Sequence, residues 1–367
     1  MLSYVQTLVL AWVLVSGPVE GVDESSILET PVQPAGEIGL IFQGQVELAL
    51  DEEAPAIGSV AWMSVSPDSS LLLVDGVGDA AHEFSLLDGR YIRSFGRKGA
   101  GPGEYTPPIA ISIDPTGFVY LLHTAGIIRY DRLGNYLDQW TGYDDTRVLT
   151  GREGELFVLG RERDMTVSRL DPATWEMSYH TPVSTDREQF LTARMGRYYH
   201  LCYSTSRHRL YYLGVNDYHV KEIDATTGEI TRRFGFRPEG FTPLPGRFHD
   251  VGTGTRELMT ELMSSGMTLL MRMTLFQDRY LLVRHATDPG WAIYDLEGEG
   301  ASTIKVYGLT PDSEERFRSL AVHVPWNRIA AWEDRLCIWR PPSEEESEIS
   351  NGTIELYGID LASGQGG

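Results

Sequence analysis

The chain has 367 residues, of which 42% are hydrophobic, and it carries 31 basic against 52 acidic side chains, a formal net charge of −21 at pH 7. This charge repels phosphate backbones and argues against sequence-independent nucleic-acid binding, and its self-repulsion favours a monomer. The 38 glycines and 19 prolines indicate many turns rather than long helices. The length fits two average domains or one large all-β domain.

Residues 1–21 are typical of a secretory signal peptide. The apolar run Val5–Val15 is shorter than the roughly 20 residues that span a bilayer, but it has the length of a signal core. Val19 and Gly21 occupy cleavage-site positions, although no Lys or Arg precedes the run, so either the signal is atypical or the true start lies upstream. We expect an extracytoplasmic protein, periplasmic or secreted, without stable membrane insertion after cleavage. Residues 22–37 are polar, contain prolines and predict a linker.

From residue 38 onward, short hydrophobic runs of strand length alternate with turn residues. A unit of four such runs recurs six times, and self-similar four-strand units are the sequence signature of a β-propeller. We predict an all-β fold, a six-bladed β-propeller of four-stranded antiparallel blades over residues 38–362, with a flexible tail at 363–367. The sixth unit lacks an outer strand, and the N-terminal strand at 38–50 is expected to supply it and close the ring. A β-sandwich is the rival architecture, but it does not predict repeats.

The largest insertion in this pattern covers residues 236–266. Within it, Thr255 is placed to cap a helix at 256–264 that Gly266 would end. This helix either packs over one end of the ring or forms a methionine-lined lid over the channel mouth, and we favour the first alternative. Cys202 and Cys337 lie within hydrophobic runs and are expected to be buried rather than disulfide-bonded or reactive.

One stretch has a recognisable family pattern. Phe95-Gly96, the glycine-rich turn, Pro102-Gly103-Glu104-Tyr105, Pro108, Ile113-Asp114, Gly117 and Val119-Tyr120 follow one another in the order of the NHL repeat, which this stretch resembles. The whole chain resembles secreted bacterial six-bladed propellers of the NHL or TolB-like kind. Later units keep the strand pattern but not the Pro-Gly-Glu signature. The resemblance implies the fold and leaves the function open, because such propellers include both binding modules and enzymes.

Several common chemical motifs are missing. The glycines at 96–103 precede a strand and not a helix, so they predict a turn between blades and not a phosphate loop. The predicted inner strands offer few of the 6 to 8 oxygen ligands that calcium needs. Calcium is therefore possible but not supported, and no cofactor is predicted, although a register error of one residue would change the ligand set. No HExxH spacing and no G-x-S-x-G elbow occur. Asn351-Gly352-Thr353 matches a glycosylation sequon, and we interpret it as a hairpin turn.

The candidate site lies on the predicted inner strands. Arg147, Arg272 and Arg328 fall on units three, five and six, with Trp62 on unit one and His200 on unit four. Arginines that converge on the channel would bind an anion, with aromatic rings for stacking, or they would pair with acidic residues of neighbouring blades.

Three functions remain open at this point. The first is a non-catalytic exported module that binds a protein, peptide, glycan or small anionic ligand at one face or at the channel mouth. The second is a metal-dependent hydrolase or lyase with its site in the channel. The third, a structural repeat within a larger envelope assembly, has the same sequence features as the first. The scarcity of converging carboxylates and of nucleophile motifs favours the binding module over an enzyme.

Overall fold

The structure is a computed structural model of the chain. It describes residues 27–50, 54–66, 68–141, 144–161, 165–184, 199–248, 256–285, 290–296, 303–316, 329–332, 334–343, 346 and 350–360. The predicted signal peptide, residues 22–26 of the linker and the C-terminal tail lie outside these residues, as does Arg328. None of the described helices is long and apolar enough to cross a bilayer.

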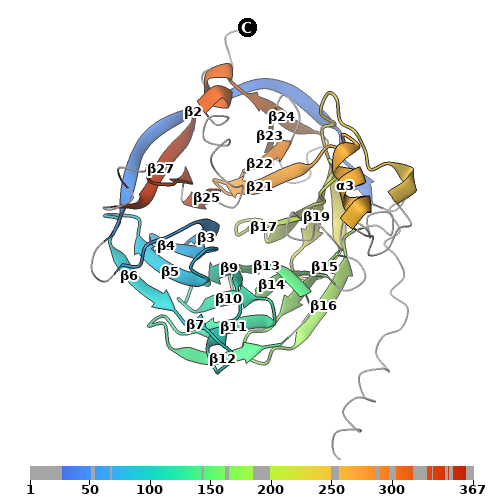
Figure 1. Ribbon diagram of the computed structural model, residues 1–367. Coiled ribbons are helices and arrows are strands. Elements are labelled where there is room, and N and C mark those ends of the chain that lie inside the picture. Colours follow the sequence, from blue (N-terminus) through green and yellow to red (C-terminus); the bar gives the residue numbers. More distant parts are fainter. Residues whose placement is uncertain are drawn as a thin grey trace, which may run out of the picture.

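The described strands form a propeller-like ring of antiparallel sheets (Figure 1). The first sheet consists of β3 (Val60–Val65), β4 (Ser70–Asp75), β5 (Ala80–Ser85) and β6 (Tyr91–Phe95). The second consists of β9 (Pro108–Ile113), β10 (Val119–His123), β11 (Gly126–Tyr130) and β12 (Tyr136–Trp140). The third consists of β13 (Asp144–Thr150), β14 (Leu156–Arg161), β15 (Met165–Leu170) and β16 (Met177–Pro182). The fourth consists of β17 (His200–Ser204), β18 (Arg209–Leu213), β19 (Val220–Asp224) and β20 (Ile230–Phe234), with β1 (Leu28–Glu29) added in parallel to β20.

The rest of the ring is one eight-stranded sheet, in the order β21-β22-β23-β24-β2-β27-β26-β25. Its strands are β21 (Leu270–Phe276), β22 (Tyr280–His285), β23 (Trp291–Asp295), β24 (Ile304–Leu309), β2 (Val32–Ala49), β27 (Ser350–Asp360), β26 (Arg335–Arg340) and β25 (Ile329–Trp332). The sequence predicted two separate blades here. They are joined because β2 pairs in parallel with β24 through its first half and antiparallel with β27 through its second half.

The N-terminal strand is thus longer than predicted. A strand was expected from residue 38, beside the last unit, and β2 does pair with β27 as that expectation requires. However, β2 begins at Val32, and β1 lies still earlier, so part of the segment predicted as a linker is strand. The reason is that the backbone of this segment pairs with the outer strands β20 and β24, which covers edges that would otherwise stay unpaired. In Figure 1 the segment follows the outside of the ring.

The innermost strands surround the axis of the ring. They contact one another in the order β3, β9, β13, β17, β21 and β25, and β25 in turn contacts β3. Tight turns of the predicted kind connect the strands within a sheet. At the β9–β10 turn, for example, the Asp114 carboxylate accepts hydrogen bonds from the backbone N–H groups of Thr116 and Phe118, and Gly117 has a φ of 94°, which favours glycine.

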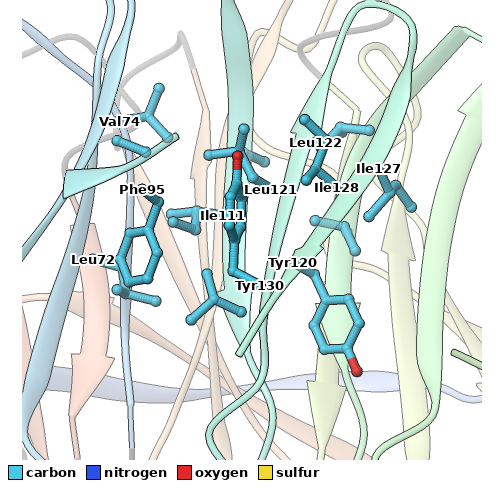
Figure 2. Packing of buried hydrophobic residues seen from close by; sticks show 14 of the residues in the cluster. Leu72, Val74, Phe95, Ile111, Tyr120, Leu121, Leu122, Ile127, Ile128 and Tyr130 are labelled. Carbon is cyan, nitrogen blue, oxygen red and sulfur yellow. The ribbon is translucent and has the colours of Figure 1, made fainter. Parts of the chain in front are cut away.

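Apolar side chains fill the space between neighbouring sheets. In the cluster of Figure 2, side chains of the first sheet, among them Leu72, Val74 and Phe95, pack with Ile111 and Tyr130 of the second, and all five are at most 1% exposed. Sheets that pack face to face through such side chains hold the backbone of the inner strands in fixed positions. The core therefore sets the geometry of any site on the ring axis.

A short two-stranded pair and short helical segments complete the described fold. The pair is β7 (Arg97–Lys98) with β8 (Glu104–Tyr105), and the helical segments are η4 (Gly246–Phe248), α3 (Arg256–Ser264) and residues 311–316. The helix α3 spans the range that the sequence predicted. Its Leu262 is buried in the cluster that contains Tyr212 and Phe248, and the helix lies toward the rim of the ring in Figure 1. The packing of Leu262 agrees with a helix docked on the sheets and not with a lid over the axis.

Candidate functional site

Irregularities in pairing occur at the same place in several inner strands. The register between inner strand and neighbour shifts by one residue at Ala61 in β3, at Thr146 in β13 and at Met271 in β21. A bulge of this kind changes the direction in which the next side chain points, and bulges are frequent near functional sites. The residues that follow these three shifts are Trp62, Arg147 and Arg272, all of them predicted site residues.

The structure brings these three side chains together. The guanidinium carbon of Arg147 lies 4.6 Å from the centre of the Trp62 ring, and that of Arg272 lies 5.1 Å from it. Both distances are within the range of cation–π attraction. The three residues come from the first, third and last of these sheets, yet each is at most 8% exposed. We call this group of Trp62, Arg147 and Arg272 the axial stack.

The second sheet makes room for the indole. β9 has the same register shift, at Ile109, but the residue that follows it is the small Ala110. Trp62 and Ala110 belong to one core cluster, and the indole N–H of Trp62 donates a hydrogen bond to the carbonyl of Ile111 at 3.2 Å. This bond fixes the ring, because it uses the only polar group of the indole.

Two nitrogens of the Arg272 guanidinium donate hydrogen bonds, and the third has no acceptor in the described part of the chain. Its Nε donates to the Thr274 hydroxyl at 3.3 Å, and its Nη2 donates to the carbonyl of Ile329 on β25. Nη1 is buried and has no acceptor among the described residues. Burial lowers the pKa of Arg272 to about 10, so the group remains a cation at neutral pH. A buried cation without a counter-charge is costly for a fold.

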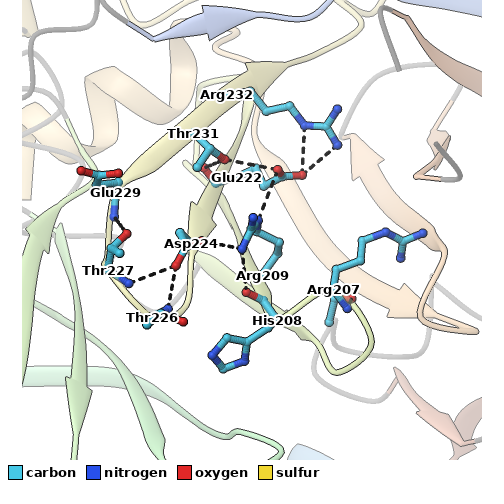
Figure 3. A network of polar contacts seen from close by, with 11 residues as sticks. Arg207, His208, Arg209, Glu222, Asp224, Thr226, Thr227, Glu229, Thr231 and Arg232 are labelled. Atoms are coloured by element: carbon cyan, nitrogen blue, oxygen red, sulfur yellow. Dashed lines mark hydrogen bonds and ion pairs between the residues drawn. The ribbon is translucent and has the colours of Figure 1, made fainter. Parts of the chain in front are cut away.

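Several arginines elsewhere in the ring pair with carboxylates. In Figure 3, the Arg232 guanidinium lies 2.8 Å from the Glu222 carboxylate, and Arg209 lies 2.6 Å from Asp224. The sequence left open whether the inner-strand arginines pair in this manner with neighbouring blades. Within the part of the chain that the structure describes, Arg272 makes no ion pair with a carboxylate.

One cysteine contributes to the surroundings of the stack. The thiol of Cys202 on β17 interacts electrostatically with both Arg272 and Arg147, but burial dominates and raises the pKa of Cys202 to about 11. Its Sγ lies 3.6 Å from the carbonyl of Met273, so the thiol is protonated and hydrogen-bonded.

Cys337, the other cysteine, is a free thiol too, with a pKa that burial raises to about 12. Neither cysteine forms a disulfide, and neither has the low pKa of a reactive thiol.

The other two predicted site residues are not part of the axial stack as defined here. His200 begins β17 and is buried. Arg328 lies outside the described residues. The described residues also hold no group of three His, Cys, Asp or Glu side chains that is arranged to bind a metal ion.

The glycine-rich loop is occupied by a side chain of the chain itself. Glu104 Oε2 accepts hydrogen bonds from the backbone N–H groups of Ala100 and Gly101, at 3.1 and 2.9 Å. Its other oxygen pairs with Arg97 at 2.7 Å. These hydrogen bonds lower the pKa of Glu104, and the bond from the Gly101 N–H has the largest effect. The backbone groups that would cradle a phosphate therefore already bind a carboxylate, and the loop connects two sheets, as predicted.

One buried group was not singled out from the sequence. His285, at the end of β22, is 2% exposed, and neither ring nitrogen has a hydrogen-bond partner among the described residues. Burial lowers its pKa to about 4, so the ring is neutral at pH 7. Its sequence context, a strand of hydrophobic residues, gives no signal of this.

Comparisons with known proteins support the fold. No protein-family model matches the chain, and neither does any curated protein sequence. Among solved structures, the chain is similar to a Bacteroides fragilis protein described as a candidate exported protein, with a TM-score of 0.61 and 14% identity over 91% of this chain and 98% of that one. It is also similar to a member of the DUF4221 family from Bacteroides vulgatus, with a TM-score of 0.58 and 10% identity over 89% of this chain and all of that one.

The class of protein follows from these likenesses and from the ring. The chain is an all-β protein with a propeller-like arrangement of sheets. At 10 to 14% identity the likenesses concern the fold alone, and the resemblance to NHL and TolB-like propellers stays a prediction.

Proposed function

We propose that the protein is an exported, non-catalytic six-bladed propeller that binds a small anionic ligand at the axial stack. The count of six treats the eight-stranded sheet as two blades joined through β2. It is supported by the closed cycle of contacts among the inner strands. Export is supported by the apolar run Val5–Val15 and by the description of the similar Bacteroides fragilis protein.

The observation that carries the binding site is the state of Arg272. Arg272 is 5% exposed, yet among the described residues its Nη1 has no acceptor and its guanidinium makes no ion pair with a carboxylate. Arg147 shares the same indole ring, so two cations lie within roughly one Debye length, about 10 Å, of each other. Like charges at this separation repel, and the repulsion is strong where water is largely excluded. An anion beside Nη1 would offset both the repulsion and the missing hydrogen bond.

The side chains of the axial stack are also held in place before a ligand binds. Trp62 offers a rigid apolar surface, and the hydrogen bonds from Arg272 to Thr274 and Ile329 hold its guanidinium in place. Side chains that are already fixed lose little entropy when a ligand binds. A metal-dependent hydrolase is not proposed, because no described cluster of ligating side chains favours it.

Thermal unfolding in the presence of anions tests this function. Acetate, nitrate, sulfate and phosphate are compared with chloride at constant ionic strength and pH 7. At 100 times its dissociation constant, a ligand of the folded state adds about 2.7 kcal/mol of stability, which raises the Tm by several degrees. We expect at least one anion to do so in the wild type.

The matched variants are Arg272→Met and Arg90→Met. Arg90 is largely exposed, so its replacement removes the same charge from the surface and should keep the response to anions. Arg272→Met should abolish it. Equal responses in Arg272→Met and in the wild type, or no response to any anion, would refute the proposed function. Trp62→Phe, which keeps a ring but loses the hydrogen bond to Ile111, provides a second variant and should weaken the response.

A further inference from the structure

We infer that the ligand group bound by the axial stack is a carboxylate, which enters end-on along the ring axis. This inference rests on the anion site proposed above and names the chemistry of its ligand. A carboxylate has two sources, a free carboxylic acid and the C-terminus of a peptide, and both present the same two oxygens.

The number of free donors favours a carboxylate. Two of the three guanidinium nitrogens of Arg272 are already used, by Thr274 and by the carbonyl of Ile329. The indole N–H of Trp62 is used as well, by the carbonyl of Ile111. Of the nitrogens of Arg272, Nη1 alone has no acceptor among the described residues, so the donors that remain for a ligand are its two N–H groups and the second N–H of Nη2. A carboxylate needs few donors, whereas a phosphate group presents three strong acceptor oxygens that would each need a partner.

Charge favours the same group. The cost of moving an ion out of water rises with the square of its charge in the Born description, and the site is nearly closed to water. A dianion also approaches a protein of formal net charge −21 against about twice the repulsion that a monoanion meets. At pH 7 a carboxylate carries one negative charge, while sulfate carries two and phosphate between one and two.

Shape supports an end-on approach. Trp62, Arg147 and Arg272 are 8%, 2% and 5% exposed, so only a slender group can reach Nη1. A carboxylate is planar and thin, so it can approach Nη1 past the edge of the indole, whose faces attract the guanidinium groups and would repel an anion. The rest of such a ligand would remain outside the stack, along the axis that the inner strands surround.

Binding measurements on the full chain test the inference. The probes are acetate and benzoate as free acids, triglycine and triglycine amide as peptides, and sulfate and phosphate as comparators, all at pH 7 and one ionic strength. We expect acetate, benzoate or triglycine to bind at least tenfold more tightly than sulfate and phosphate. Triglycine amide, which lacks the carboxylate, should not bind.

Two variants check that binding occurs at the stack. Arg272→Lys keeps the charge, but its ammonium cannot bond to Thr274 and Ile329 and also place a nitrogen where Nη1 lies, so it should bind the carboxylate at least tenfold more weakly. Arg90→Met should bind like the wild type. If only triglycine binds, the source is a peptide terminus, and if only acetate or benzoate binds, it is a free acid; both results support the inference. Tighter binding of sulfate or phosphate that depends on Arg272, or equal binding of triglycine and its amide, would overturn it and leave the anion site standing. No binding by any anion would remove both.

Discussion

Replacement of Asn351 by alanine should weaken the closure of the ring more than any surface change. The Asn351 amide accepts a hydrogen bond from the N–H of Ile57 at 2.8 Å and donates to the carbonyls of Ala49 and Pro55 at 2.8 and 3.0 Å. Its side chain is 2% exposed. It therefore ties the start of β27 to the segment that connects β2 with β3.

The magnitude follows from what the alanine leaves behind. The N–H of Ile57 would be buried without an acceptor, which costs about 1–3 kcal/mol, and the two carbonyls would lose hydrogen bonds worth about 1 kcal/mol each. Because the carbonyls belong to partly exposed residues, water recovers part of the loss. We expect Asn351→Ala to lower the free energy of unfolding by roughly 2–4 kcal/mol.

Urea unfolding followed by tryptophan fluorescence measures this change as a lower transition midpoint. Asn135→Ala is the matched control, because the Asn135 amide donates to Asp131 in an exposed turn, and it should change stability by less than about 0.5 kcal/mol. If the two variants were equally stable, the amide would not hold the closure and the reasoning would be wrong. The same burial makes Asn351 inaccessible to glycosylation in the folded protein, although it begins a sequon.

Three further changes have expected outcomes that thermal or urea unfolding can check. Gly89→Ala should destabilise by roughly 2–4 kcal/mol, because a Cβ would lie 1.8 Å from a backbone oxygen of β2 and the φ of +74° disfavours alanine; a loss below about 0.5 kcal/mol would contradict this packing. Tyr105→Phe should cost about 1–3 kcal/mol, because the hydroxyl accepts from the N–H of Ala81 and donates to the carbonyl of Phe95, and an unchanged midpoint would argue against both bonds. The pKa of His285, lowered to about 4 by burial from 6.5, means that only the unfolded chain takes up its proton between these values, so stability should fall by about 3 kcal/mol as the pH drops from 6.5 to 4. His285→Gln should remove that part of the pH dependence, and a pH profile identical to that of the wild type would contradict the assignment.

Much of the ring could be predicted because its strands are short and its turns carry their own chemistry. The hairpin turn is specified by the four consecutive residues Asp114–Gly117, and the structure shows the hydrogen bonds that this pattern implies. The helix Arg256–Ser264 was predictable for the same reason, since its end is marked by Gly266, which has a φ of +74°. Such local signals do not depend on the rest of the chain.

The path of the N-terminal segment could not be predicted. Leu28–Glu29 and the first residues of β2 mix polar with isolated apolar residues, include Pro34, and have the composition of a linker. They are strands only because β20 and β24 offer unpaired edges. Strand formation at an edge depends on the neighbour and not on the composition of the added strand, so the sequence of this segment alone contains no signal for it.

The axial stack was predictable in part. Arg147 and Arg272 were found because arginine is unusual on an inner strand, and Trp62 because an aromatic ring suits the same site. Their convergence depends on register shifts at the preceding residues, and those residues, such as Ala61 and Met271, have no turn or glycine signal. Strand periodicity cannot reveal such shifts, which arise from the packing of one sheet against the next.

The long strand β2 has a consequence for the order in which the protein folds. Its second half pairs with β27, so strands near the two ends of the described chain depend on each other, and the hydrogen bond between Ile57 and Asn351 spans 294 residues. Contacts this distant in sequence form slowly, because the entropy of a large loop is lost before they contribute. The sheet that contains β2 can therefore be completed only after β27 has been synthesised. Until then its edges stay available for wrong pairing, which makes this the step at which the chain most needs protection from aggregation.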